Sequence, residues 1–422
     1  MYLHGRSVND LRAQESVVKR AQWLRTGAAI LFALGALGLL CLVVWARTSS
    51  TTAVFAWGTP GTYDFVEYWA AAQLWLQGEN PYDLAALLRV ERAVGWPEDA
   101  PLPMYNPPWT LPLLLTIAPF PFGLAALIWL VLGSTWLMVA SRLLWNVQVS
   151  SDRSYRTALL LILGFTPALV ALHNGQISPW LLLGVAMALY GVQRNRDIMA
   201  GVGLALLMIK PHITYLFWPV ALWWALRERR VGIVVGWVAA LIVGSGLALL
   251  WAPVVFSHYF ATMVTSAPPY AAPTLGTWLQ LLVDPRQHQP WLQLLPSLLA
   301  GLGLLIWLWR RRGRWQWPDL SLPLLLVSVP TAVYGWSFDF VVLLPVVLKL
   351  IAGTRTTPDA RRIVVLGALV VLQLTLLVQN RLRVNDVFSV WYPLALGTLY
   401  VWTHLRCRGE SILGVGAQAG AT

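Results

Sequence analysis

The sequence is dominated by apolar runs that alternate with short, arginine-rich loops. Of its 422 residues, 58% are hydrophobic and 11% are charged, whereas soluble domains are about a quarter charged. Repeated runs of this kind predict transmembrane helices. We therefore expect a single all-α polytopic domain over 1–422 with about 12 transmembrane helices. The runs are 27–45, 122–145, 157–172, 179–193, 198–209, 213–226, 231–251, 296–309, 319–334, 337–352, 363–379 and 387–404.

The distribution of lysine and arginine predicts the orientation. Basic residues precede the first run, and with the N-terminus in the cytoplasm about 23 of the 30 Lys and Arg fall inside. Both termini are then cytoplasmic. The segment 107–121 is too short to span and would reverse this bias if it crossed, so we expect it to be re-entrant or interfacial. The rule also accounts for the net charge of +12, and no nucleic-acid partner is expected.

The N-terminal run and the cysteines carry no further chemistry. The run 27–45 is too long for the core of a signal peptide and lacks a clear cleavage site, so we interpret it as a retained helix. Cys41 and Cys407 lie near opposite ends of the chain, and neither spacing nor context suggests a disulfide or a metal site.

Two long extracytoplasmic loops follow from this orientation, 46–107 and 252–295. We expect interfacial helices in the first and leave the role of the second, with His258 and His288, open. The first loop carries seven of the 18 acidic residues. They are Asp64, Glu67, Glu79, Asp83, Glu91, Glu98 and Asp99.

Asp64 begins an expected helix that lies in the interface. Apolar residues recur at Phe65, Trp69 and Leu76, while Glu67 shares the other face with Asp64. Partial burial beside aromatic residues would raise the pKa of Asp64 toward that of a general base. The alternatives are a helix N-cap or a solvated surface charge.

Other polar side chains lie where the apolar runs break. His173, Asn174, Gln176 and Ser178 occur in "ALHNGQISPW", where a plain hairpin turn would need only Asn-Gly. Tyr105 and Asn106 precede a diproline that could serve simply as a helix breaker.

Four basic residues are candidates to bind a phosphate at this face. Lys210 and His212 lie in "KPH" at membrane depth, where ionisable groups are usually functional, although a snorkelling lysine is the alternative. Arg381 and Arg383 depart from the charge rule, and structural pairing with Asp386 is their alternative role. Asp339 lies at the outer end of a helix, where it could equally favour the helix dipole.

Five blocks, in order, resemble the bacterial membrane glycosyltransferases of family 87. They are "YDFVEYWAAAQLWLQGENPYD", "YNPPW", "HNGQISPW", "KPH" and "WSFDFVVLLP". The resemblance covers roughly residues 60–345, and its first block is the most specific.

The resemblance implies a GT-C-type fold with its active site on the first extracytoplasmic loop, in a bacterial inner membrane. It implies a polyprenyl phosphate sugar as donor and a glycolipid or glycan as acceptor. Asp64 matches the family's catalytic aspartate. Some relatives carry a histidine near "WSFDF", where this chain has Phe338 and Asp339, so no second acid or base is assigned there.

The resulting hypothesis is transfer of a mannose-like hexose to an acceptor hydroxyl by inverting displacement, without a metal. Asp64 acts as general base, while Lys210, His212, Arg381 and Arg383 stabilise the leaving phosphate. A transporter or flippase is the alternative, although the sequence shows no convincing internal repeat, and a structural membrane subunit would leave the acidic loop unexplained. The expected substrate-binding residues are Glu67, Tyr68, Asn80, Tyr82, Tyr105, Asn106, His173, Asn174, Gln176 and Asp339.

Overall fold

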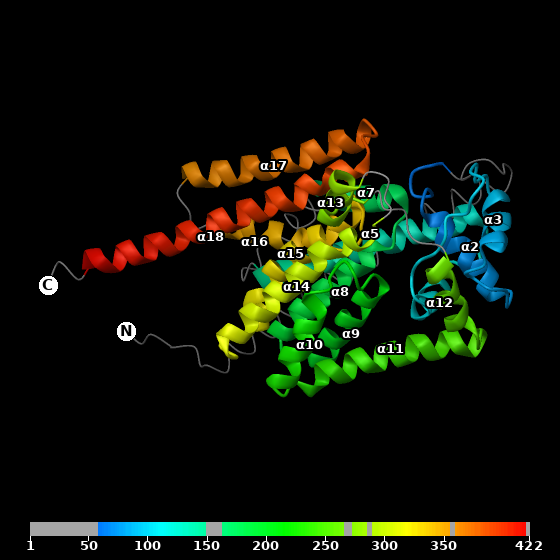
Figure 1. The fold of residues 1–422 in the computed structure, drawn as a ribbon, viewed down its shortest axis with the longest axis horizontal. Helices are drawn as coiled ribbons and strands as arrows, with labels where there is room; N and C mark the ends of the chain where they lie inside the picture. Colours follow the sequence, from blue (N-terminus) through cyan, green and yellow to red (C-terminus); the bar gives the residue numbers. More distant parts are fainter. Residues whose placement is uncertain (1–57, 149–162, 266–271, 285–288, 355–358, 419–422) are drawn as a thin grey trace, which may run out of the picture. The chain divides into compact units, whose positions relative to one another are not determined.

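The computed structural model describes residues 58–148, 163–265, 272–284, 289–354 and 359–418, all within one compact unit, Trp57–Thr422. These residues form helices and turns, with no strand among them (Figure 1). The expected helix 27–45, Cys41, His288 and the first part of the run 157–172 lie outside the described residues.

Four helices in the described part of the chain are long and apolar enough to cross a membrane. A helix rises about 1.5 Å per residue, so a bilayer core of about 30 Å needs roughly 20 residues. The predicted count of about 12 spans is therefore not confirmed. The four are α5 (Phe122–Gln148), α11 (Val231–Trp251), α14 (Trp291–Arg311) and α17 (Asp359–Arg381).

Most of the other apolar runs form shorter helices because they are interrupted. The expected helix 337–352 is a 3-10 segment, Ser337–Leu343, followed by α16 (Leu344–Gly353), with Pro345 at its start. The run 198–209 ends in a 3-10 turn, Leu207–Ile209. The remaining shorter helices of these runs are α7 (Thr166–Asn174), α8 (Ser178–Gln193), α9 (Asp197–Leu206), α10 (Phe217–Arg227) and α15 (Trp317–Thr331). By contrast, α18 (Trp391–Gln418) has 28 residues and follows a 3-10 turn, Asp386–Val390.

The first loop contains the predicted helix, α2 (Phe65–Leu76), and a second one, α3 (Leu84–Arg92). Gly78 follows α2 with a φ of +76° that glycine adopts without strain. The alternative of a solvated surface charge is wrong for Glu67, because its side chain is buried, as are those of Tyr68 and Phe65 on the same helix.

The segment 107–121 does not span. It forms a 3-10 turn, Pro108–Thr110, and the short helix α4 (Leu111–Leu114), and it then returns to α2. Gln73 Nε2 donates to the carbonyl oxygen of Ala118 at 2.6 Å, and Trp69 Nε1 donates to that of Phe120 at 3.0 Å.

The second long loop is largely helical. It contains α12 (Val255–Thr265) and α13 (Leu275–Val283) before α14 begins at Trp291. Thr262 Oγ1 donates to the carbonyl oxygen of Tyr82 at 3.0 Å, so α12 covers part of the first loop.

Small residues bring the central helices into close contact. A Cβ atom on Gly201 of α9 would lie 2.1 Å from the carbonyl oxygen of Ile233 in α11, and one on Gly203 would lie 2.7 Å from that of Gly184 in α8. Such small-residue contacts are typical of helix packing in membranes. They hold α8, α9 and α11 as the frame on which the site is built, with α9 visible between the labels of α8 and α11 (Figure 1).

Candidate active site

Asp64 is fixed by a tight junction between the first loop and the end of α7. The backbone N–H of Gly61 donates to the carbonyl oxygen of His173 at 2.6 Å, and that of Asp64 donates to Asn174 at 2.7 Å. Gly175 ends α7 in a left-handed conformation, with φ of +73°. A Cβ atom there would lie 2.3 Å from the carbonyl oxygen of Gly61, so only glycine permits this approach.

The next residue, Gln176, connects Asp64 to two other buried groups. Its Nε2 donates to Asp64 Oδ2 at 2.9 Å, while its Oε1 accepts from the Tyr68 hydroxyl at 2.8 Å and from Lys210 Nζ at 3.1 Å. Asp64 begins α2 without capping it through its side chain. The N-cap alternative is therefore wrong.

Lys210 is a buried member of an ion pair. Its Nζ donates to Asp339 Oδ1 at 2.9 Å, and the same oxygen accepts from Ser178 Oγ at 2.6 Å. Asp339 Oδ2 accepts from the backbone N–H of Trp336 at 3.1 Å. Lys210 Nζ also lies 4.7 Å from the ring centroid of Phe338, within the range of a cation–π contact. The snorkelling alternative is wrong, since the ammonium group points into the protein.

Burial sets the protonation of the carboxyl groups on α2. It raises the pKa of Asp64 to about 6, against the opposing effects of the Gln176 hydrogen bond and the charge of Lys210. Burial and the neighbouring Asp64 raise the pKa of Glu67 well above its usual range. Near neutral pH, Asp64 is therefore mainly a carboxylate and suits a general base.

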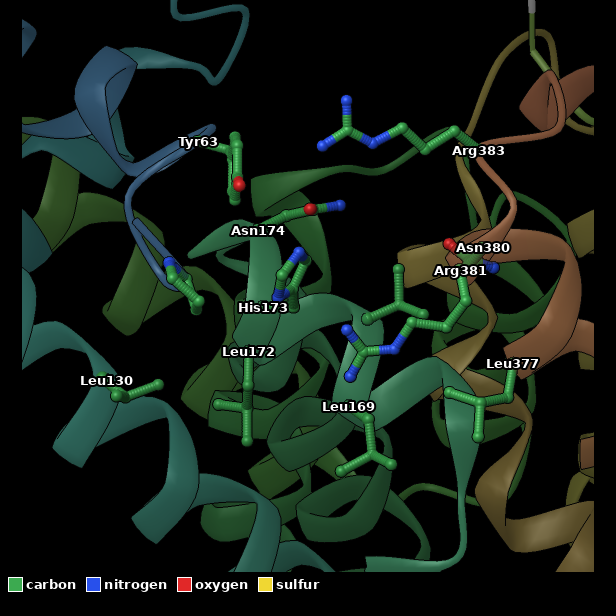
Figure 2. Close-up of a pocket in the computed structure, with 12 residues that line it drawn as sticks. Tyr63, Leu130, Leu169, Leu172, His173, Asn174, Leu377, Asn380, Arg381 and Arg383 are labelled. Carbon is green, nitrogen blue, oxygen red and sulfur yellow. The ribbon is translucent and has the colours of Figure 1, made fainter. Parts of the chain in front are cut away.

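A cavity of about 580 Å³ borders the junction between the first loop and α7 (Figure 2). Asp64 and Gln176 are not among the residues that line it, although their neighbours Tyr63 and Asn174 are. Leucines form one part of its wall, Leu130, Leu169, Leu172 and Leu377. Tyr63, His173 and Asn174 line one side, and Asn380, Arg381 and Arg383 line the other, with both guanidinium groups pointing across toward His173 and Asn174 (Figure 2). Such a cavity suits a ligand with a lipid portion and an anionic head.

The four predicted phosphate ligands fall into two groups. Arg381 and Arg383 line the cavity, whereas Lys210 and His212 do not. Burial lowers the pKa of His212 to about 3, so its imidazole is neutral, and it stacks on Tyr334 with ring centroids 4.1 Å apart.

The alternative of structural pairing between these arginines and Asp386 is not what the structure shows. Asp386 Oδ2 accepts from the backbone N–H of Ser337 at 2.9 Å, and its Oδ1 accepts from Ser389 Oγ at 2.8 Å. Neither arginine forms an ion pair with a described residue. Burial lowers the pKa of the His173 imidazole, and the charge of Arg381 lowers it further.

The remaining predicted residues lie around the network. Asn106 Nδ2 donates to the backbone carbonyl oxygen of Ile209 at 3.1 Å. The backbone carbonyl oxygen of Asn106 accepts from the Tyr82 hydroxyl at 2.9 Å. Asn80 Oδ1 accepts from the backbone N–H of Tyr82 at 3.0 Å. These three residues fix the backbone around the site, and Tyr105 lies near Tyr334 beside them.

Sequence reasoning did not assign three residues that the site uses. Ser178, whose hydroxyl donates to Asp339, lies two residues after Gln176 and was singled out as polar without a role. Tyr63 lies next to Asp64, inside a block already singled out. Asn380 adjoins Arg381. All three residues lie within two positions of an assigned residue in the sequence, so they could have been proposed as site residues. The sequence does not indicate which of such neighbours point into the site, because that depends on the fold.

Four of the described helices are long and apolar enough to span a membrane, which indicates a membrane protein. The sequence model of glycosyltransferase family 87 matches residues 104–321, just over half of the chain. The chain belongs to this family and is a membrane glycosyltransferase, so the transporter alternative is not favoured. The matched region includes Gln176 and Lys210 but begins after Asp64. No curated protein and no solved structure matches the sequence.

Proposed function

We propose that this enzyme transfers a mannose-like hexose from a polyprenyl phosphate to an acceptor hydroxyl, with Asp64 as general base. The observation that carries the proposal is the cavity with leucines on its wall and two arginines on one side, which begins one residue from Asp64, at Tyr63. The polyprenyl chain lies along the leucines, and the phosphate lies between Arg381 and Arg383.

The proposed step is a direct displacement at the anomeric carbon. Asp64 accepts the proton of the acceptor hydroxyl, whose oxygen forms the new bond to the anomeric carbon as the bond to the phosphate oxygen breaks. The anomeric centre is inverted. The leaving phosphate gains one negative charge, which the guanidinium groups of Arg381 and Arg383 stabilise. These fixed cations supply the charge stabilisation without a metal.

In this proposal Lys210 and His212 do not bind the donor phosphate. The charge of Lys210 is balanced by Asp339 at 2.9 Å, and His212 is neutral. The acceptor, a glycolipid or glycan, approaches Asp64 past Tyr63 and Asn174. We assign this site to the extracytoplasmic side of a bacterial inner membrane, with both termini in the cytoplasm, an orientation that the predicted distribution of basic loops supports.

The test is a transfer assay with the purified protein in lipid vesicles. Radiolabelled polyprenyl phosphate hexoses are supplied with candidate glycolipid and glycan acceptors. We expect labelled product from a polyprenyl phosphate hexose and none from a nucleotide sugar. Transfer from nucleotide sugars alone would contradict the assigned donor.

The acid side of the pH profile should report Asp64. Because its pKa is about 6 and the base must be charged, kcat should fall about tenfold per pH unit below about pH 6. The same raised pKa means that charged Asp64 costs stability above pH 6. The folded protein therefore gains stability from this group as the pH falls from about 6 to about 4. A flat kcat from pH 7 to pH 4.5 would contradict the assignment.

Arg381→Gln and Arg383→Gln should weaken donor binding. Each loses a charge-assisted contact, worth about 1.5–3 kcal/mol, so we expect KM for the donor to rise about 10- to 100-fold. The matched control is Arg310→Gln, which changes an exposed arginine in the last turn of α14, outside the cavity. Unchanged donor KM in both cavity variants would place the phosphate elsewhere.

A further inference from the structure

Gln176 uses both ends of its amide, and this fixes which way the group faces. Oε1 takes two donors, the Tyr68 hydroxyl and Lys210 Nζ, and Nε2 donates to Asp64 Oδ2. Turning the amide over would place its oxygen against a carboxylate and its NH₂ against an ammonium group. Both contacts are repulsive, so the amide has one favourable orientation.

The backbone around Gln176 is equally constrained. Gly175 accepts a hydrogen bond from Trp129 Nε1 at 2.8 Å, and the N–H of Gln176 donates to the carbonyl oxygen of Ala171 at 2.9 Å. Gln176 itself is only 7% exposed. Its side chain therefore reaches Asp64 from a fixed base, with little freedom to turn toward a substrate.

One oxygen of the Asp64 carboxylate is held and the other is not. Oδ2 accepts from Gln176, while Oδ1 has no hydrogen-bond partner among the described residues. Asp64 is also partly exposed, unlike Gln176. Holding Oδ2 leaves Oδ1 to meet an incoming hydroxyl.

We propose that Gln176 is a positioning residue for the general base rather than a substrate ligand. It holds the Asp64 carboxylate by one oxygen and links it to the buried Lys210–Asp339 pair through its amide. The role first expected for Gln176, contact with substrate, is replaced by one exerted through Asp64. This inference rests on the proposed function of Asp64.

The test is Gln176→Glu, which keeps the size of the side chain and replaces the donating NH₂ by oxygen. Two carboxyl groups then face each other, and the group that stabilised charged Asp64 is lost. We expect kcat at pH 7 to fall about 100-fold, the acid limb of the pH profile to move up by at least one unit, and the donor KM to change less than threefold.

Gln193→Glu makes the same chemical change at the other end of α8, where Nε2 donates to the carbonyl oxygen of Val147 at 3.2 Å. It should leave kcat, the acid limb and KM unchanged. Tyr68→Phe is a second variant, milder because Lys210 still donates to Gln176. It should lower kcat about three- to tenfold and move the acid limb in the same direction.

A donor KM that rises more than tenfold in Gln176→Glu, with an unmoved acid limb, would overturn the proposal and make Gln176 a substrate ligand. An unmoved acid limb in Tyr68→Phe would overturn it if Gln176→Glu does not fold. Different results would reject the positioning role of Gln176 and the general-base role of Asp64. An active Asp64→Asn enzyme contradicts the base itself, whereas an inactive one alongside normal Gln176 variants contradicts only the positioning role.

Discussion

Asp64→Asn is expected to lower sugar transfer by on the order of 10³-fold, the middle of the range for losing a general base. The asparagine amide cannot take the proton of the acceptor hydroxyl. Its carbonyl oxygen can still accept from Gln176 Nε2, so the network around it persists. Transfer is measured with a polyprenyl phosphate hexose and acceptor, and folding by size-exclusion profile and thermal unfolding in detergent.

Asp83→Asn is the matched control in the same loop. Asp83 Oδ1 accepts from the backbone N–H of Ala86 at 2.8 Å and caps α3, a task that asparagine performs about as well. Both variants lose one carboxylate from one loop, but only Asp64→Asn should lose activity. Turnover within tenfold of wild type in Asp64→Asn would show that another group takes the proton.

Lys210→Met is expected to destabilise the protein by about 3–5 kcal/mol, because it leaves the Asp339 carboxylate buried without its cation. Asp339 is 2% exposed and its other partners are Ser178 and the backbone of Trp336. The measurement is the thermal unfolding midpoint in detergent, compared with Lys349→Met, an exposed lysine on α16.

The double variant Lys210→Met/Asp339→Asn separates pairing from phosphate binding. Removing both charges relieves the unpaired carboxylate, so most of the lost stability should return. If Lys210 instead binds the donor phosphate, the donor KM of the double variant should rise more than tenfold. Recovered stability with a nearly normal KM supports the buried pair.

Much of the helical fold follows from hydropathy alone. The predicted runs 122–145 and 231–251 correspond to α5 and α11 because these helices are long, apolar and bounded by arginines or proline. The prediction of one continuous helix over 337–352 is wrong. The apolar composition of this run does not distinguish a continuous helix from a 3-10 segment followed by α16, since both bury the same side chains.

The site could be predicted as a set of residues but not as an arrangement. Lys210 was identified because an ionisable group at membrane depth is costly, and Asp339 because it lies at the end of an otherwise apolar helix. Gln176 exceeds what a hairpin turn needs, and Asp64 begins a helix in the acidic first loop. Their pairing depends on three breaks in helices that are distant in the sequence, and local patterns do not determine it. Charge alone therefore grouped Lys210 with Arg381, although the fold neutralises the first and exposes the second.

The junction between the first loop and α7 also constrains how a substrate enters. Two backbone hydrogen bonds and the close approach of Gly175 to Gly61 couple the base to one side of the cavity, so that these two elements shift together or not at all. The opposite side is formed by exposed arginines at the end of α17. Under the proposed function, we expect any widening that admits a lipid to come from the side of α17, with the junction that holds Asp64 staying in place.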